Sequence, residues 1–205
     1  RYNALCDEIA HMTGNFTLST LWDMEKFYDN IDIIRLIGFA EQYDFPVAIL
    51  ALGMQMHMAA RGLKCYDIYP EPTMPTNGII AGCTQSTTFT KVLLYRLLDK
   101  CYYAFQSTQL RSFVDDMRSS HYGSADHVGT VARQSATMLV KGLQRLKCKI
   151  AQKSVVLGTR LHMKQKLLRH MRGLKCPCKM VMTAKDLGLG TTAGVRRTNQ
   201  TPVSY

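Results

Sequence analysis

The segment Ser112-Phe-Val-Asp-Asp-Met117 decides the fold, read together with the earlier segment Leu21-Trp-Asp-Met-Glu-Lys-Phe-Tyr-Asp29. Each is a short apolar run that ends in carboxylates. Two strands of this kind side by side would bring Asp23, Asp115 and Asp116 to one place. Three carboxylates there repel each other strongly unless divalent cations lie between them. Oxygen ligands suit magnesium, and two magnesium ions about 3.5 to 4 Å apart are the usual device for in-line phosphoryl transfer.

A simpler interpretation of the Asp115-Asp116 pair stays open, because two acidic residues between short apolar runs are also ordinary hairpin-turn chemistry. Short motifs often match by chance. The metal-site hypothesis therefore depends on what the rest of the chain supplies.

Composition is that of a folded protein. The chain has 205 residues, of which 46% are hydrophobic and 9% aromatic, so it can bury a core in one domain, with or without an appendage. No run of 18 apolar residues occurs, and we therefore expect no membrane span and no membrane partner. The first residues lack the pattern of a signal peptide and an initiator Met, which suggests a fragment.

The seven cysteines are odd in number and irregularly spaced, which favours reduced thiols in an intracellular compartment. Cys176 and Cys178 are the only close pair. A zinc site would need further ligands, for which His162 and His170 are the candidates. Buried or incidental thiols are the alternative that we favour.

Charge is distributed very unevenly along the chain. Residues 1–140 carry 11 Lys and Arg against 14 Asp and Glu, whereas residues 141–205 carry 15 against a single acid, Asp186. An acidic front with a basic back suits a metal-bearing site next to a polyanion. A solvated basic tail is the alternative.

Hydrophobic periodicity predicts an alternation of strands and helices. Strands are expected at 15–22, 63–69, 109–114, 117–122 and 153–159, with Asp115-Asp116 as a hairpin turn. Helices are expected at 31–40, 46–61, 82–103, 125–147 and 161–174. Residues 1–18 show no clear period, and 180–189 reads as two short strands around Asp186-Leu187-Gly188. The order predicts an α+β fold, with helices packed on one face of an antiparallel sheet in the split β-α-β (ferredoxin-like or RRM-like) topology.

The expected helix at 161–174 is basic and amphipathic, which favours contact with a nucleic-acid backbone over a membrane surface. The residues expected to bind phosphates are Arg160, Lys164, Lys166 and Arg169. Glycines before the helix at 82–103 let the backbone approach a phosphate or base closely, although a simple turn explains them equally well.

These motifs together resemble the palm domain of reverse transcriptases, in the group of non-LTR retroelements and group II introns, over about residues 18–190. Asp23 to Asp29 resembles the first palm motif, and Phe113-Val-Asp-Asp116 resembles the aromatic-x-Asp-Asp turn. Gly78-Ile-Ile-Ala-Gly82 resembles the loop that rests against template and nascent base pair. Leu146 to Lys153 and Asp186-Leu-Gly188 resemble the motifs at the leaving pyrophosphate and at the primer.

The resemblance implies a retroelement protein that is an RNA-directed DNA polymerase with a two-magnesium mechanism. Its partners would be an RNA template, a DNA primer and deoxynucleoside triphosphates. We expect it inside the cell, in the nucleus. Asp23, Asp115 and Asp116 would be catalytic and metal-binding. The nucleotide would contact residues from three motifs, with Tyr28 as a steric gate at the sugar: Phe27, Tyr28, Gly82 and Lys153. Template and primer would contact Gly78, Leu187 and Gly188 as well as the basic helix.

The resemblance also divides the chain into four parts: a remnant of the fingers (1–18), the palm (19–159), the basic helix with a primer-grip-like hairpin (160–190) and a loose tail (191–205). The chain departs from the family pattern at Ala81-Gly82, where the family usually has Gln-Gly, so a hydrogen-bonding side chain is missing. Fingers and thumb are largely missing as well. Two other functions stay open: a nucleic-acid-binding module without catalysis, and another two-metal palm enzyme such as a nucleotidyl cyclase.

Overall fold

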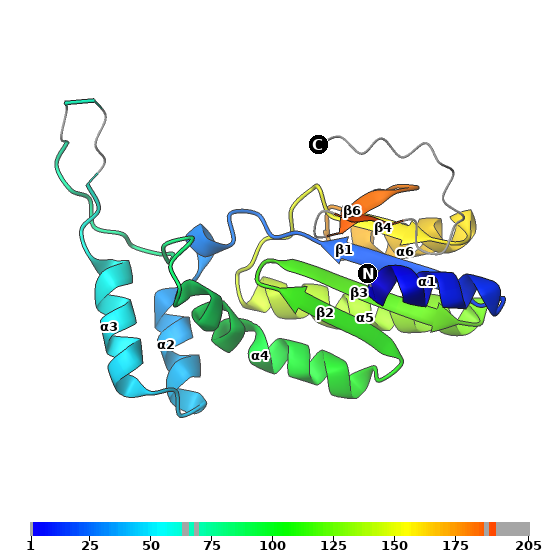
Figure 1. Ribbon diagram of the computed structural model, residues 1–205, viewed down its shortest axis with the longest axis horizontal. Helices are drawn as coiled ribbons and strands as arrows, with labels where there is room; N and C mark the ends of the chain where they lie inside the picture. Colours follow the sequence, from blue (N-terminus) through cyan, green and yellow to red (C-terminus); the bar gives the residue numbers. More distant parts are fainter. Residues whose placement is uncertain (1, 63–65, 68–69, 187–188, 192–205) are drawn as a thin grey trace.

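A five-stranded open sheet forms the centre of the molecule in the computed structural model, which describes residues 2–62, 66–67, 70–186 and 189–191 (Figure 1). The strand order is β2-β3-β1-β4-β5. The strands are β1 (Phe16–Trp22), β2 (Thr108–Phe113), β3 (Asp116–Gly123), β4 (Val155–Gly158) and β5 (Lys179–Met180). β1 pairs antiparallel with both β3 and β4, so the first strand of the chain lies inside the sheet.

The topology is the split β-α-β arrangement that the sequence predicts. β1 leads through helices to the β2–β3 hairpin, and α5 (Ala125–Arg145) then returns the chain to β4 on the other side of β1. The α+β class is thereby confirmed. The sheet is not purely antiparallel, because the short β5 runs parallel to β4.

Helices α5 and α6 (Leu161–Gly173) cover one face of the sheet. His121 of β3 links the sheet to α5, since its Nε2 lies 2.8 Å from Ser135 Oγ and its Nδ1 lies 3.0 Å from the Leu18 carbonyl oxygen. Burial lowers the pKa of His121 to about 4. His121 is thus a buried polar residue of the sheet.

The opposite face carries a helix that the sequence did not predict, α1 (Tyr2–Met12). It lies across the strands in Figure 1, on the side away from α5. A buried ion pair connects it to the sheet, with Arg118 Nη2 3.0 Å from Asp7 Oδ2. Tyr122 also donates a hydrogen bond to Asp7. The expectation that helices pack on one face therefore holds for α5 and α6, and α1 is an addition to it.

A group of helices extends from one end of the sheet, on the left in Figure 1. It consists of α2 (Ile33–Gln42), α3 (Val47–Met58) and the first part of α4 (Ser86–Ala104). Asp32 caps α2 by accepting a hydrogen bond from the Arg35 backbone N–H. The core continues from the sheet into this group through Phe89 of α4, which is fully buried.

Three expectations fall partly or wholly on undescribed residues. The strand expected at 63–69 has only Tyr66 and Asp67 described, and these form a turn. The two short strands near the end are present as β6 (Ala184–Asp186) and β7 (Leu189–Thr191), with Leu187 and Gly188 outside the described residues. The tail at 192–205 is likewise outside them. Within the described part of the chain, no helix is both long and apolar enough to cross a membrane.

Candidate active site

The three aspartates of the sequence hypothesis lie at one end of the sheet. Trp22 and Met117 form the last residue pair between β1 and β3, so Asp23 and Asp116 extend the same two strand ends. Asp115 belongs to the two-residue turn of the β2–β3 hairpin, between the paired residues Phe113 and Asp116. The turn therefore consists of Val114 and Asp115, one residue earlier than predicted.

Val114 occupies an unusual backbone conformation in this turn. Its φ is +59°, in the left-handed region that β-branched residues rarely adopt. Conformations of this kind cost of order 1–3 kcal/mol and cluster at functional sites. The residue next to Asp115 is thus held in a conformation that the hairpin must stabilise.

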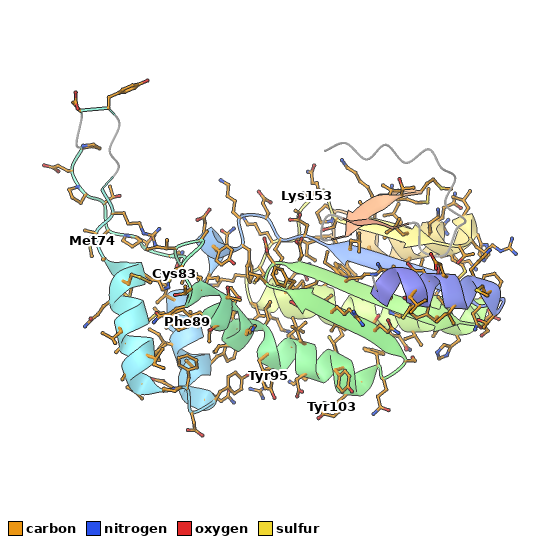
Figure 2. All side chains as sticks on the ribbon, viewed as in Figure 1. Met74, Cys83, Phe89, Tyr95, Tyr103 and Lys153 are labelled. Atoms are coloured by element: carbon orange, nitrogen blue, oxygen red, sulfur yellow. The ribbon has the colours of Figure 1, made fainter. Side chains whose placement is uncertain are left out.

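The ammonium group of Lys153, a residue labelled in Figure 2, lies within electrostatic reach of all three carboxylates. Its Nζ lies 2.6 Å from Asp23 Oδ2. The hydrogen bond and the charge of Asp23 raise the pKa of Lys153, and the charges of Asp116 and Asp115 add to this effect. The Lys153 side chain is 74% exposed, so the ammonium group lies in solvent at the edge of the carboxylates.

Backbone hydrogen bonds fix Asp23 against the segment that precedes β4. Ser154 Oγ accepts from the Asp23 N–H at 3.0 Å and donates to the Asp23 carbonyl oxygen at 3.2 Å. The Ala151 N–H donates to the same carbonyl at 2.8 Å. Sequence reasoning missed Ser154, because a serine at the start of a strand carries no signal of this role.

Tyr28 lies beside this carboxylate group in η1, the short 3-10 helix Tyr28–Asn30. Burial raises its pKa, and the charge of Asp115 raises it further, which places the phenol within electrostatic reach of the hairpin turn. The ring packs edge-on against Phe27 at a centroid distance of 5.7 Å. Phe27 itself is 4% exposed and belongs to the core. The predicted nucleotide contact of Phe27 stays a prediction, and the burial of its ring leaves the backbone for such a contact.

Gly78 and Gly82 differ in what surrounds them. Both have positive φ, +83° and +82°. A Cβ at Gly78 would lie 2.8 Å from the Asp29 carbonyl oxygen, and the Ile79 N–H donates to the Tyr28 carbonyl, so this loop packs directly on η1. Nothing lies within 4 Å of a Cβ at Gly82. Gly78 thus positions Tyr28, and Gly82 faces open space where a ligand has room.

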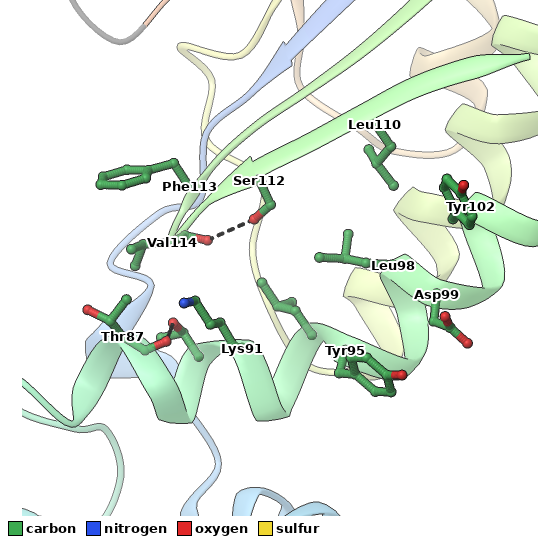
Figure 3. Close-up of a pocket in the computed structure, with 12 residues that line it drawn as sticks. Thr87, Lys91, Tyr95, Leu98, Asp99, Tyr102, Leu110, Ser112, Phe113 and Val114 are labelled. Atoms are coloured by element: carbon green, nitrogen blue, oxygen red, sulfur yellow. Dashed lines mark hydrogen bonds between the residues drawn. The ribbon is translucent and has the colours of Figure 1, made fainter. Parts of the chain in front are cut away.

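A cavity of about 540 Å³ lies between α4 and β2, on the other side of the hairpin (Figure 3). Leu94 and Leu98 of α4 face Leu110 of β2 across it. Phe113 and Val114 line the end nearest the turn. A molecule in this cavity would contact the turn that carries Asp115.

The donor set at the strand ends fits magnesium, since it consists of carboxylates without nitrogen or sulfur ligands. The positions of these side chains, in contrast, do not make a complete metal site. No group of three or more His, Cys, Asp or Glu side chains within the described ranges is placed to hold a metal ion. The Lys153 ammonium group occupies one carboxylate oxygen of Asp23. Metal binding would therefore require movement of Lys153 or of the carboxylates.

Comparison with solved structures shows which known proteins share this fold. The chain matches apo telomerase from Candida tropicalis truncated from its C-terminal domain, with a TM-score of 0.62, 13% sequence identity, and coverage of 94% of this chain and 38% of that chain. It also matches telomerase from the same organism in complex with the TWJ fragment of telomeric RNA (TM-score 0.55, 14% identity, 77% and 29% coverage). The chain has the fold of a polymerase palm. No protein-family profile and no curated protein matches the sequence.

The palm fold accounts for part of the basic region but corrects one of its residues. Arg160, Lys166 and Arg169 are exposed, and the Arg160 guanidinium lies over the Phe16 ring, 5.4 Å from its centroid. Lys164 is 3% exposed, and its Nζ lies 3.4 Å from Met182 Sδ. Burial lowers the pKa of Lys164. The prediction that it contacts phosphates is therefore wrong, because the side chain points into the protein.

Proposed function

We propose that this palm catalyses template-directed nucleotidyl transfer, as an RNA-directed DNA polymerase of retroelement origin. The observation that supports the proposal is the placement of Asp23 and of the Asp115–Asp116 hairpin at the same end of the sheet. The RNA named for one telomerase neighbour supports a nucleic-acid partner for this fold. The chain spans 38% of the length of the first telomerase chain.

The proposed site residues have distinct roles. Asp23 and Asp115 would hold two magnesium ions, and Asp116 would support them from the edge of the site. The ions would supply charge neutralisation at the phosphates and a more acidic primer hydroxyl. Ser154 would keep the Asp23 backbone in position through its two hydrogen bonds. Tyr28 would contact the sugar of the incoming deoxynucleotide, with Gly78 fixing its backbone.

Lys153 would act in this reaction as a proton donor or as a positive charge that changes its partner. In the structure its ammonium group neutralises Asp23, which limits carboxylate repulsion. On arrival of the nucleotide it would release Asp23 and turn to the leaving pyrophosphate, as a general acid or as a counter-charge. The exposure of its side chain leaves room for this movement.

The test is binding of divalent manganese, as a spectroscopic substitute for magnesium, followed by primer extension on an RNA template. Asp115→Asn should abolish extension and weaken manganese binding, because the ligand charge is lost while the side-chain shape is kept. Asp126→Asn on the exposed start of α5 is the matched control and should leave both unchanged. Unaltered manganese binding by Asp115→Asn would remove the two-metal site from the proposal.

A nucleic-acid-binding module without catalysis is the second candidate. It is favoured by the ion pair that occupies Asp23 and by the missing preformed ligand group within the described residues. Such a module would bind RNA and DNA with steep salt dependence and would extend no primer. Binding of nucleic acid without primer extension would favour it.

A further inference from the structure

Cys176 and Cys178 form a close pair at the junction between α6 and β5. Their sulfur atoms lie 3.6 Å apart and share a hydrogen bond. A disulfide requires about 2.05 Å between the sulfurs. A movement of about 1.5 Å would therefore join them. The pair has no place in nucleotidyl transfer, and two thiols held in contact across one proline suggest a separate chemistry.

A cavity next to this pair gives small molecules access to it. Cys176 is 3% exposed, yet it lines a cavity of about 450 Å³ at the ends of α5 and α6. Cys148 lines the same cavity, but burial raises its pKa to about 11 and makes its thiol inert. The hydrogen bond from the Cys178 thiol lowers the pKa of Cys176. Cys176 is thus the nucleophilic sulfur of this cavity.

The charge of the cavity defines which molecules it attracts. Lys147, Lys149 and Lys175 line it, against a single acidic lining residue, Glu25. Lys147 is engaged with Asp32 outside the cavity, at 3.0 Å. Lys149 and Lys175 follow the ends of α5 and α6 and remain for a ligand. An anionic molecule is therefore favoured over a neutral or cationic one.

We propose that Cys176 and Cys178 are a thiol-oxidation site, which reacts with anionic low-molecular-weight disulfides such as glutathione disulfide. The Cys176 thiolate attacks one sulfur of the small disulfide, whose S–S bond breaks and releases one thiol. The Cys178 thiolate then attacks the Cys176 sulfur and releases the second thiol. The dithiol loses two electrons and two protons, and the small disulfide gains them as two thiols.

The experiment incubates the reduced 205-residue chain with glutathione disulfide and follows intact mass and peptide maps. We expect loss of two hydrogens and a peptide that joins Cys176 to Cys178. Cys178→Ser should stop at one glutathione attached to Cys176, since the resolving thiol is missing. Cys176→Ser should react at neither position. Cys83→Ser, which removes a half-buried thiol elsewhere, is the control and should behave like the unaltered chain.

Charge preference is tested with the cationic disulfide cystamine. The unaltered chain should react several-fold faster with glutathione disulfide than with cystamine. Lys149→Gln with Lys175→Gln should lose this preference. Lys100→Gln with Lys141→Gln has the same net charge and should keep it, because both residues are exposed and neither lines the cavity. A preference unchanged by the cavity substitutions would overturn the assignment of the ligand class.

Two results would overturn the oxidation site itself. One is a Cys178→Ser protein, folded by circular dichroism, in which glutathione attaches to Cys6 or Cys83 but not to Cys176. The other is an unaltered chain that stays fully reduced while a small dithiol is oxidised in the same solution. Neither result depends on polymerase activity, so the site stands or falls independently of the proposed function.

Discussion

Tyr28 is the single residue that best separates a polymerase from a nucleic-acid-binding module. Its backbone carbonyl is fixed by the loop at Gly78, and its phenol lies within the field of Asp115. A ring held in this way beside a bound nucleotide discriminates by its bulk. A core aromatic would show no such selectivity.

We expect Tyr28→Ala to raise incorporation of ribonucleotides relative to deoxyribonucleotides, in an active polymerase that contains this chain. The pocket change opens room for one hydroxyl group, an effect of about 1–3 kcal/mol or roughly 10- to 200-fold. Tyr28→Phe keeps the ring and should keep the selectivity. The measurement is single-nucleotide extension with each substrate, and equal loss of both substrates would assign Tyr28 to the core.

His121 should make the fold sensitive to acid. Its pKa is about 4 in the folded protein against 6.5 for the exposed side chain. The unfolded chain therefore binds a proton between these values and the folded chain does not, so stability is complete above pH 6.5 and falls as the pH approaches 4. The loss should reach about 3 kcal/mol.

The check is urea unfolding of three proteins between pH 7 and pH 4. His121→Gln should flatten the decline in the free energy of unfolding, at some cost in stability at pH 7. His162→Gln replaces an exposed histidine and should decline as the unaltered chain does. An equal decline in His121→Gln would assign the acid sensitivity to other groups.

Among the elements, the loop from Gly78 to Gly82 provides a matched pair of glycines. Alanine at either position is strained, because both have φ near +80°. Only at Gly78 does the added Cβ meet backbone atoms below 3 Å. Gly82→Ala should therefore cost about 1 kcal/mol, and Gly78→Ala clearly more, about 3 kcal/mol. Thermal and urea unfolding measure the difference, and equal costs would show that the loop moves away from η1 freely.

How far the sequence predicts an element depends on where its signal lies. The strand β1 and the helix α5 carry recurring apolar residues, and their positions were predicted to within a few residues. α1 was missed, because its attachment uses the buried polar side chain of Asp7 and its stripe of Leu5, Ile9 and Met12 remains exposed. A helix held by a buried ion pair to a distant strand has no local signature.

The same limit applies to the candidate site. That Asp23, Asp115 and Asp116 lie at the same end of the sheet could be predicted, because each is next to the end of an apolar run. The burial of Phe27 and Lys164 could not be predicted, since a motif or an amphipathic pattern shows residue types and not which side chains are buried. Ser154 and the Cys176–Cys178 contact depend on pairings that only the folded chain brings together.

At the scale of the whole molecule, charge is the property that the sequence predicts most directly. The net charge is +11, and the excess lies in residues 141–205. Arg160, Lys166 and Arg169 present part of it on the exposed side of α6. This surface should attract the phosphate backbone of either nucleic acid.

Replacing these three exposed residues by Gln should flatten the plot of log affinity against log salt concentration. Each lost phosphate contact removes about 0.7 to 0.9 from the slope, so the total change should be about 2 to 3. Lys164→Met on the same helix should leave the slope unchanged, because Lys164 is buried. Fluorescence anisotropy over a salt series measures both, and an unchanged slope in the triple variant would make α6 a merely solvated surface.

The central position of β1 has a consequence for how the protein folds. β1 leaves the ribosome before the other strands of the sheet. Its Ser19 is hydrogen-bonded to Ser120, which is synthesised 101 residues later, and the following Asp23 is hydrogen-bonded to Ser154, which is synthesised 131 residues later. At about 5–20 residues per second, the strand spends on the order of ten seconds with both edges unpaired during synthesis. Pairings this distant also make folding slow. The end of the sheet next to Asp23 therefore forms late, and an incompletely synthesised chain exposes an unpaired, aggregation-prone strand next to Asp23.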